Sequence, residues 1–159
     1  MTFVRHCDSP LGELSLFSDG ESLTGLYFER TEENAQREDI PVLIDAERQL
    51  AEYFGGWRQT FDLPLRPRGT EFQQSVWRAL LEIPFGQTQS YSAVARRLGQ
   101  EKAVRAVGLA NGRNPISILI PCHRVIGSNG SLTGYGGGLW RKQFLLKHEK
   151  PTASLRLAL

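Results

Sequence analysis

Residues 90–112 decide the fold of the second half of the chain, and their sequence is SYSAVARRLGQEKAVRAVGLANG. Ser90 or Ser92 can cap a first short helix, and Gly99 can end it. The apolar positions of that helix are Val94, Ala95 and Leu98. A second helix is expected over residues 102–112. Two short helices joined by a tight turn that contains glycine form a helix-turn-helix motif.

The second of these helices carries few side chains that could address the edges of DNA bases. In residues 103–110, Arg105 is the single long charged side chain among small residues. A smooth surface such as that of Ala103, Ala106 and Gly108 lets a backbone approach DNA closely, which suits the minor groove. Arg105 could then occupy the space of an extruded base. The same pattern is also compatible with tight helix packing and an ordinary solvated arginine.

Helix signals continue on both sides of this motif. Thr70 and Gln73 form a capping box for a helix that stops near Pro84 and Gly86. Its inward positions are Phe72, Val76, Trp77 and Leu80. A final helix is expected from Trp140 to His148, and residues 151–159 are expected to form a tail. The second half of the chain is therefore predicted to be mostly helical.

The first half has the pattern of a small sheet backed by one helix. Strand-like stretches at residues 3–7, 13–17 and 23–28 are separated by turn residues, which predicts an antiparallel meander. Asp45 can cap a following helix that ends at Gly55 and Gly56. A proline-rich linker is expected at residues 62–69. The predicted domains are residues 1–66 and 67–150.

Charge differs sharply between these two halves. Residues 1–66 carry 6 basic and 13 acidic side chains, a balance of −7, whereas residues 67–159 carry 13 and 4, a balance of +9. An acidic half joined to a basic half indicates two domains, of which the second faces a polyanion. Nucleic acid is the leading candidate for that partner.

Composition excludes several classes of protein. The chain has 159 residues, of which 40% are hydrophobic, and no apolar run approaches the roughly 18 residues that a membrane span requires. Its two cysteines, Cys7 and Cys122, are too few for a disulfide framework, and the first five residues do not resemble a leader. We therefore expect a globular cytoplasmic protein without a membrane partner.

The chemistry is expected at residues 121–125, Pro-Cys-His-Arg-Val, which follow the apolar run 116–120. A thiol is a good nucleophile only as the thiolate, and Cys122 is followed directly by His123 and Arg124. A cysteine taken at random would more often be a small buried hydrophobe. We expect the apolar run to be a strand. Because neighbouring side chains on an extended backbone point apart, a water would have to relay the proton between Cys122 and His123.

These residues resemble the methylated-DNA–protein-cysteine methyltransferases, also called O6-alkylguanine-DNA alkyltransferases. The similarity covers the family's active-site motif, recognition helix, hinge, binding loop and an N-terminal element. In this chain they are residues 121–125, 105–108, 114–115, 134–138 and 9–12. The resemblance implies a ribonuclease-H-like N-terminal domain and a winged-helix-like, helix-turn-helix C-terminal domain. It also implies repair of O6-alkylguanine in double-stranded DNA by a monomer that takes the alkyl group onto its own cysteine in one turnover. Action on O4-alkylthymine and cooperative binding along DNA stay open.

The resemblance also implies roles for individual residues. Cys122 would be the nucleophile, with His123 as proton relay and Glu149 orienting it. Tyr91 would rotate a phosphate and donate a proton toward the guanine, and Asn114 would tie the recognition helix to the cysteine segment. Arg105, Ala106, Ala103 and Gly108 would meet the DNA. The pocket would consist of Tyr135, Val125, Gly136 and Gly137, with the carbonyls of Cys122 and Val125 accepting from the guanine amine.

Two departures from the family pattern bear on specificity and cofactors. Gly136 stands where some relatives carry serine, which predicts a roomier pocket. Some relatives hold zinc in the N-terminal domain, but here only His6 and Cys7 are near one another, and four ligands cannot be assembled from them. We expect neither a metal nor another cofactor.

Three alternatives are weighed against this hypothesis. A non-catalytic lesion binder would lack the cysteine, which is present here. A cysteine hydrolase needs a histidine in direct contact with the thiol, which adjacency in sequence makes awkward. A winged-helix regulator needs a recognition helix richer in base-contacting side chains than residues 103–110.

Overall fold

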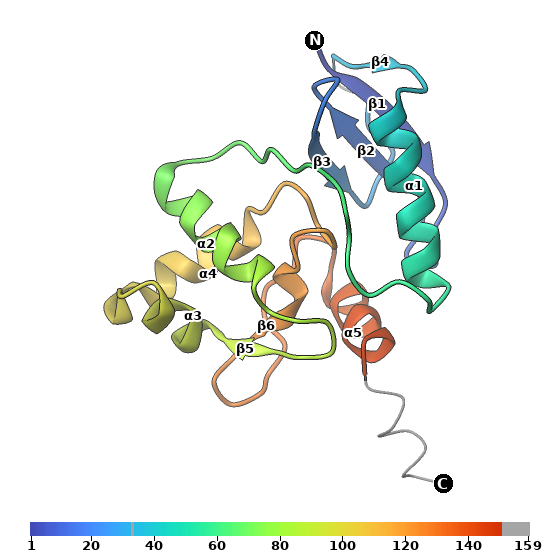
Figure 1. Ribbon diagram of the computed structural model, residues 1–159. Coiled ribbons are helices and arrows are strands. Elements are labelled where there is room, and N and C mark those ends of the chain that lie inside the picture. Colours follow the sequence, from blue (N-terminus) through green and yellow to red (C-terminus); the bar gives the residue numbers. More distant parts are fainter. Residues whose placement is uncertain (33, 151–159) are drawn as a thin grey trace, which may run out of the picture. The chain divides into compact units, whose positions relative to one another are not determined.

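The computed structural model describes residues 1–32 and 34–150 (Figure 1). The predicted tail, residues 151–159, lies outside the described residues. Within them the chain forms two compact units. One comprises Met1–Gly69 and Asn114–Leu119, and the other comprises Thr70–Arg113 and the chain from Ile120 onward. The sequence-based division placed residues 114–119 in the second domain, whereas the structure groups them with the first.

The N-terminal unit is built on a four-stranded sheet in the order β3-β2-β1-β4. The expected meander is formed by β1 (Phe3–Cys7), β2 (Leu14–Ser18) and β3 (Leu23–Tyr27), which pair antiparallel. Sequence reasoning missed β4 (Gln36–Arg37), which pairs parallel with β1. Two exposed polar residues carry no strand pattern, so only the long-range pairing reveals this strand.

Helix α1 (Pro41–Phe54) packs on one face of this sheet (Figure 1). Its buried positions are Leu43, Ala46, Gln49, Leu50 and Tyr53. The prediction that Asp45 caps the helix is wrong: the cap position is Ile40, and Pro41 fills the first helical position, where its missing N–H is harmless. Asp45 instead binds Arg48 and Gln49 one turn later. The helix ends at Gly55 and Gly56 as expected, with Gly56 at φ +93°.

The outer edge of β3 is covered at both ends by chain from elsewhere in the unit. The N–H of Leu23 donates to the carbonyl of Pro64, and the N–H of Leu26 donates to that of Pro115, at 2.8 and 2.9 Å. Leu65 and Ile116 form isolated parallel bridges with β3. The expected linker is thus hydrogen-bonded to the sheet. The bridge between Ile116 and Leu26 joins residues 114–119 to this unit.

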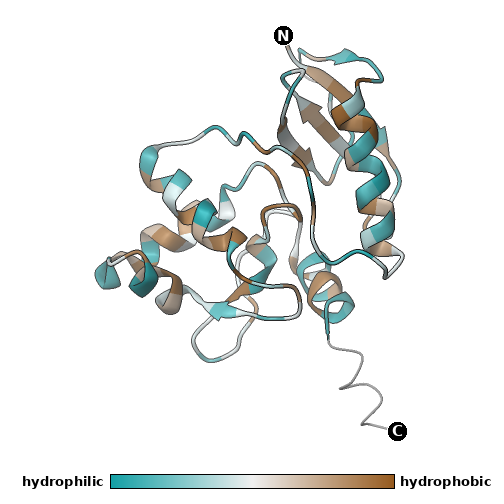
Figure 2. Ribbon diagram, viewed as in Figure 1, coloured by the Kyte–Doolittle hydropathy of each residue, from teal (hydrophilic) through white to brown (hydrophobic). Residues whose placement is uncertain are grey.

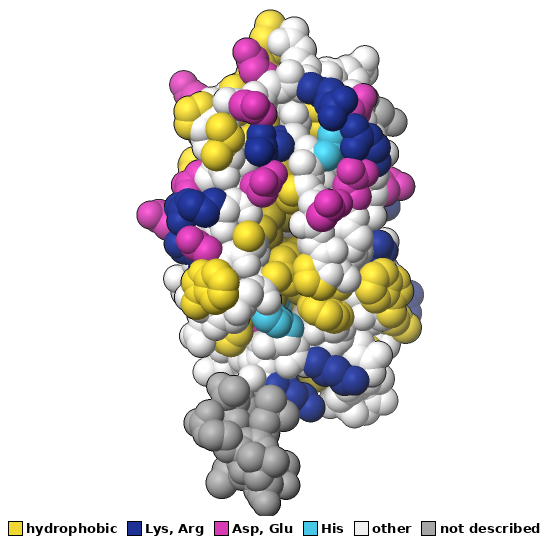
Figure 3. Space-filling model, turned by 90° about the vertical axis from the view of Figure 1, so that its right-hand side faces the viewer, with side chains coloured by type: hydrophobic (Ala, Val, Ile, Leu, Met, Phe, Trp, Pro, Cys, Tyr) yellow, Lys and Arg dark blue, Asp and Glu magenta, His cyan; other side chains and the backbone are white. Residues whose placement is uncertain are grey.

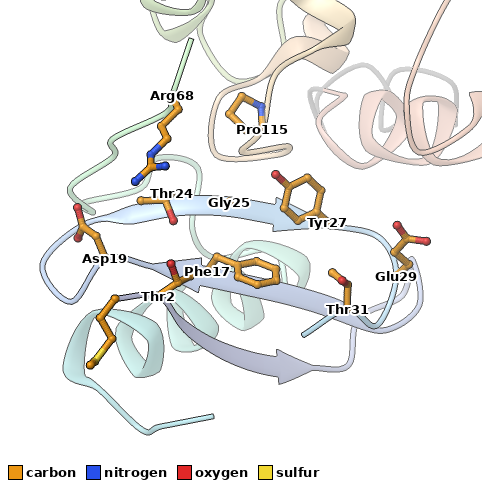
Figure 4. Close-up of a pocket in the computed structure, with 11 residues that line it drawn as sticks. Thr2, Phe17, Asp19, Thr24, Gly25, Tyr27, Glu29, Thr31, Arg68 and Pro115 are labelled. Atoms are coloured by element: carbon orange, nitrogen blue, oxygen red, sulfur yellow. The ribbon is translucent and has the colours of Figure 1, made fainter. Parts of the chain in front are cut away.

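The second face of the sheet is hollowed by a pocket of about 640 Å³ (Figure 4). The rings of Phe17 and Tyr27 stand on this face and meet edge to face at 5.7 Å, and Arg68 and Pro115 also line the pocket. Gly25 leaves room for this pair, because a Cβ there would come within 2.8 Å of the Tyr27 ring. Asp19 at the end of the pocket already accepts from the N–H groups of its own turn. The pocket is therefore a surface depression whose one acidic group at this end, Asp19, is already hydrogen-bonded within its own turn.

Acidic side chains gather over this unit among the basic ones that pair with them, as the upper part of Figure 3 shows. On α1, Arg48 pairs with Asp45 and Glu52, and Arg58 also pairs with Glu52. The burial pattern follows hydropathy: in Figure 2 strands β2 and β3 and the inner face of α1 are mostly hydrophobic, and the outer face of α1 is hydrophilic. The negative balance of the unit is thus a property of its solvated surface.

The C-terminal unit begins with α2 (Glu71–Leu81), for which the predicted capping box is confirmed. The Thr70 side chain accepts from the Gln73 N–H at 3.1 Å, and the Gln73 side chain accepts from the Thr70 N–H at 2.9 Å. The remaining elements are β5 (Gln89–Ser90), α3 (Tyr91–Arg97), the 3-10 turn η1 (Glu101–Ala103), α4 (Val104–Gly112), the 3-10 turn η2 (Cys122–Arg124), β6 (Val125–Ile126) and α5 (Leu139–His148). None of the helices in the described part of the chain is long and apolar enough to cross a membrane.

The predicted helix-turn-helix is formed by α3 and α4. Ser90 caps α3 by accepting from the Ala93 N–H, and Gly99 makes the turn at φ +71°. The indole N–H of Trp77 on α2 donates to the Ala110 carbonyl on α4 at 2.8 Å. This buried bond and the apolar core formed by Val76, Leu80, Val94, Ala95 and Val107 hold α4 in position.

Candidate active site around Cys122

Cys122 lies in a tight turn and not at the end of a strand. The expectation of a strand over residues 116–120 is wrong, because Ile118 has φ +70°, which breaks the extended backbone. A β-branched residue in this left-handed conformation is strained, and it is held by complete burial of its neighbours Ile116 and Ile120. The chain then enters η2, where the Cys122 carbonyl accepts from the Val125 N–H. Cys122 itself is 4% exposed.

A two-residue parallel ladder links this turn to the helix-turn-helix motif. Val125 and Ile126 of β6 pair with Gln89 and Ser90 of β5. The residue after β5 is Tyr91, the first residue of α3. The ladder therefore fixes the start of α3 against the end of the cysteine turn.

His123 and Glu149 form the buried pair that the resemblance implied. The Nε2 atom of His123 lies 2.9 Å from Oε2 of Glu149, with the two residues 0% and 2% exposed. Glu149 follows directly after α5 as its C-terminal cap residue. It lies four residues after Leu145 and seven after Lys142, the two buried residues of this helix. On the 3-10 turn, adjacent side chains are about 120° apart, so Cys122 and His123 still diverge.

Arg124 completes this array, a role that the sequence did not reveal. Its Nε and Nη2 atoms donate to the two oxygens of Glu149 at 2.8 and 2.9 Å, and Nη1 donates to the Ile83 carbonyl at 2.7 Å. The guanidinium also lies 5.9 Å from the centre of the Phe85 ring. Sequence reasoning treated Arg124 as a cationic neighbour of the thiol, whereas its charge is paired with Glu149.

Charge and hydrogen bonding define the protonation of this array. Burial alone would raise the pKa of Glu149, but the hydrogen bonds from His123 and Arg124 outweigh it and hold that pKa well below its usual range. Burial lowers the pKa of His123 despite its bond to Glu149, so the imidazole is neutral. An ionised carboxylate can only accept, so Nε2 of His123 carries the proton and Nδ1 presents a lone pair. Within the described chain Nδ1 has no hydrogen-bond partner.

Lys142 is the second functional candidate that sequence reasoning missed. It is 0% exposed, and its Nζ donates to the carbonyls of Val125 and Thr133 at 2.6 and 2.9 Å. Burial lowers its pKa, and its electrostatic interaction with Cys122 raises it. The same electrostatic interaction acts on both groups, so a protonated Lys142 favours the ionised form of Cys122. The signal in the sequence is its position on the apolar face of α5, three residues before Leu145.

A pocket of about 670 Å³ collects many of the predicted DNA and substrate residues in this unit. It is lined by Tyr91, Val104, Arg105, Gly108, Leu109, Gly112, Arg113, Thr133, Gly134, Tyr135 and Gly136. The Tyr91 hydroxyl donates to the Thr133 carbonyl at 3.3 Å. Since Thr133 and Val125 are both bound by Lys142, this wall of the pocket is tied to the backbone that follows Cys122.

Other predicted site residues lie outside that lining. Ala106 is exposed on α4 and Ala103 is half-buried at its start, while the carbonyl of Gly137 accepts from Arg141 at 2.7 Å. Asn114 accepts from the Ile116 N–H at 3.0 Å, as an asparagine does in a turn before proline. A hydrogen bond from α4 to the cysteine turn comes from Asn111, whose Nδ2 donates to the Cys122 carbonyl at 3.3 Å. The tie expected of Asn114 remains a prediction.

Comparison with known proteins agrees with this geometry. Residues 3–67 match the family model of the 6-O-methylguanine DNA methyltransferase ribonuclease-like domain, and residues 71–151 match that of its DNA binding domain. The chain is 50% identical over 163 residues to a methylated-DNA–protein-cysteine methyltransferase of Mycobacterium tuberculosis, covering 100% of this chain and 99% of the relative. It is 45% identical over 159 residues to the constitutive enzyme of Bacillus subtilis, covering 94% and 96%.

A solved structure shares the fold as well. The crystal structure of Mycobacterium tuberculosis OGT in complex with DNA has a TM-score of 0.86 and 48% identity, and the match covers 93% of this chain and 92% of that one. The fold expected from the resemblance, a small sheet domain and a helical DNA-binding domain, is confirmed. The chain therefore belongs to the 6-O-methylguanine DNA methyltransferase family and is an enzyme of the methylated-DNA–protein-cysteine methyltransferase type.

Proposed function

We propose that this protein repairs DNA by moving the alkyl group of O6-alkylguanine onto the sulfur of Cys122, once per molecule. The observation that carries the proposal is the buried array in which Arg124 and His123 hold Glu149, beside a cysteine that is itself 4% exposed. Such an array is unfavourable to bury unless every charge is paired, and its histidine and arginine directly follow Cys122 in the chain.

The array supplies a base for the thiol. The lone pair on Nδ1 of His123 takes the proton of Cys122 through a bridging water, and the imidazolium that forms is stabilised by Glu149. The thiolate then attacks the alkyl carbon: an S–C bond forms, and the electron pair of the C–O6 bond leaves with the guanine. The guanine anion gains a proton, for which the hydroxyl of Tyr91 is the proposed donor. One proton is lost by the thiol and one is gained by the base.

The burial of Cys122 also favours extrusion of the damaged base. A thiol that is 4% exposed cannot reach an atom inside a stacked duplex, so the nucleotide has to leave the stack. The pocket of about 670 Å³ is within the usual range of small-ligand sites, about 300–1,000 Å³. Arg105 is exposed at the rim of this pocket, where its side chain can fill the gap left in the duplex.

Tyr135 in this pocket is proposed to wall the base. The carbonyls of Cys122 and Val125, which are outside the pocket lining, are proposed to accept from the exocyclic amine of the base. The small residues Ala103, Ala106 and Gly108 are proposed to bring α4 close to the minor groove. Gly136 leaves the pocket wide, because a Cβ there would find its nearest neighbour, the Gly112 carbonyl, at 3.9 Å. A monomer acting once on one lesion is the simplest stoichiometry for this chemistry.

Mass spectrometry tests the proposal directly. The protein is mixed with excess duplex that contains O6-methylguanine, and Cys122→Ser is the control. We expect a gain of one methylene unit, located on Cys122 by peptide mapping, saturating at one per protein and missing in the control. Bound lesion DNA without any gain in mass would overturn alkyl transfer and support a non-catalytic lesion binder.

A further inference from the structure

Asn111 stands out in the C-terminal unit as a buried polar side chain on the helix that is proposed to meet DNA. It lies in the last turn of α4 and is 2% exposed. Arg105, on the same helix, is exposed. Six residues separate the two, so their side chains leave the helix about 120° apart. One helix therefore carries a solvent-facing cation and, on a different face, an amide in the core.

The amide binds the backbone of the nucleophile. Nδ2 of Asn111 donates to the Cys122 carbonyl at 3.3 Å. The same carbonyl accepts from the Val125 N–H inside the turn, and the Cys122 N–H donates to the Ile120 carbonyl at 2.7 Å. The bonds to Ile120 and Val125 stay within the local chain. The bond from Asn111 bridges eleven residues and joins the turn to α4.

Packing alone does not explain an amide at this position. Oδ1 of Asn111 is buried, and in the described residues it has no hydrogen-bond partner. A leucine has a similar size and would fill the same space without leaving a buried acceptor unpaired, which is unfavourable. The donor at Nδ2 is then the property that distinguishes asparagine here from an apolar residue.

We infer that Asn111 is a positioning residue, which ties the recognition helix α4 to the turn that carries Cys122 and thereby fixes the direction of its sulfur. The inference builds on the proposed function, since the reaction it serves is displacement at an alkyl carbon. That reaction requires the sulfur, the carbon and the leaving oxygen to be in line. A shift of about 1 Å in such a geometry can lower a rate by about 100-fold.

The test compares two substitutions of Asn111 with one of its helix neighbours. Asn111→Leu removes the donor, and Asn111→Asp keeps the shape but turns a carboxylate oxygen toward the carbonyl. Val107→Ala is the matched control, because Val107 is 0% exposed on the same helix and its truncation lowers stability without touching a polar contact. Single-turnover transfer is followed against the concentration of duplex that carries O6-methylguanine, and again with free O6-benzylguanine.

For Asn111→Leu we expect the maximal rate constant to fall about 10-fold or more, with the duplex concentration at half-maximal rate unchanged. Asn111→Asp should lose more. The loss should be the same on the free base, because the position of the sulfur matters for both substrates. Thermal melting shows that each variant is folded at the assay temperature. If a variant is not folded at that temperature, hydrogen exchange of the Asn111 side-chain amide in the wild type provides the second measurement. Slow exchange supports the hydrogen bond to the Cys122 carbonyl, and fast exchange counts against it.

Two results would overturn the inference. One is a maximal rate of Asn111→Leu within twofold of the wild type, and the other is an equal loss in Val107→Ala. If the wild type itself fails to transfer an alkyl group, the proposed function fails first. If the wild type transfers the alkyl group normally and Asn111→Leu transfers it at the same rate, only the role of Asn111 is refuted.

Discussion

Replacing Glu149 with glutamine probes the buried array at its centre. Glu149 accepts three hydrogen bonds, from Nε2 of His123 and from Nε and Nη2 of Arg124, at 2.8–2.9 Å. The amide keeps the shape but removes the negative charge, which leaves the guanidinium of Arg124 buried beside a neutral group. Breaking a buried ion pair from one side costs about 3–5 kcal/mol. For a chain of this size that corresponds to a fall in Tm of about 10 °C.

The same change should slow the chemistry for a separate reason. The neutral amide no longer stabilises the imidazolium that forms when His123 takes the proton. One end of the glutamine side chain is also an NH2 group, whereas Arg124 donates to both oxygens of Glu149 and His123 faces Oε2. Where the NH2 group takes the place of Oε2, it faces Nε2 of His123 and favours the tautomer with the proton on Nδ1. That tautomer cannot take the proton of Cys122. Loss of a positioned general base lowers a rate by about 10²–10⁴-fold, and we expect Glu149→Gln to fall in this range.

Single-turnover transfer from duplex O6-methylguanine and thermal melting measure the two effects on the same samples. Glu82→Gln is the matched control: Glu82 pairs with Arg97 but its side chain is 68% exposed, so the same loss of charge should change Tm by less than about 2 °C. A folded Glu149→Gln variant that transfers methyl at the wild-type rate would refute the role of Glu149 and His123 as the proton relay. A Tm within 2 °C of the wild type would refute the energetic argument.

Three further outcomes are expected. Arg105→Ala should slow repair in duplex DNA at least about 10-fold while leaving transfer from free O6-benzylguanine unchanged, because only the duplex requires extrusion; equal losses on both would remove Arg105 from that role. Gly136→Ser should lower the rate with benzyl lesions relative to methyl by about 10-fold, since it narrows the pocket without strain, and an unchanged ratio would contradict the roomier pocket. Because the pKa of His123 is lowered in the folded state, the unfolded chain binds a proton near pH 6.5 that the folded chain does not. Stability should therefore fall by up to about 1.4 kcal/mol per unit as pH drops below about 6.5, as measured by urea unfolding, and His123→Gln should flatten this slope.

The parts of the fold that were predictable are those that local chemistry specifies. The capping box of Thr70 and Gln73 and the left-handed glycine at Gly99 depend on residues a few positions apart, and both are found as predicted. The prediction that Asp45 caps the first helix is wrong, because aspartate is a common N-cap residue but the helix already starts at Pro41, one turn earlier. Strand β4 depends on pairing with distant chain, which no local pattern records, and the turn at Ile118 follows Ile116, which bridges to β3.

The candidate site divides along a similar line. Cys122 and His123 are adjacent in the sequence, and the resemblance implies Glu149, so the reacting groups could be predicted from the sequence. The residues that hold them could not. Arg124, Lys142 and Asn111 are polar residue types that usually lie on the solvated surface of helices and loops. Only their burial and their bonds to Glu149, Val125 and Cys122 distinguish them from ordinary surface residues.

Burial also divides the positive charge of the C-terminal half into two groups with different effects. Arg124 and Lys142 belong to the balance of +9, but they are 7% and 0% exposed and bind a carboxylate and two carbonyls inside the unit. They cannot release counterions from DNA. Arg105 and Arg113 are exposed at the pocket and can. Removing one exposed cation should thus reduce the salt dependence of DNA affinity and leave the thiol unchanged, whereas removing a buried one should alter stability and the reactivity of Cys122 and leave the salt dependence intact.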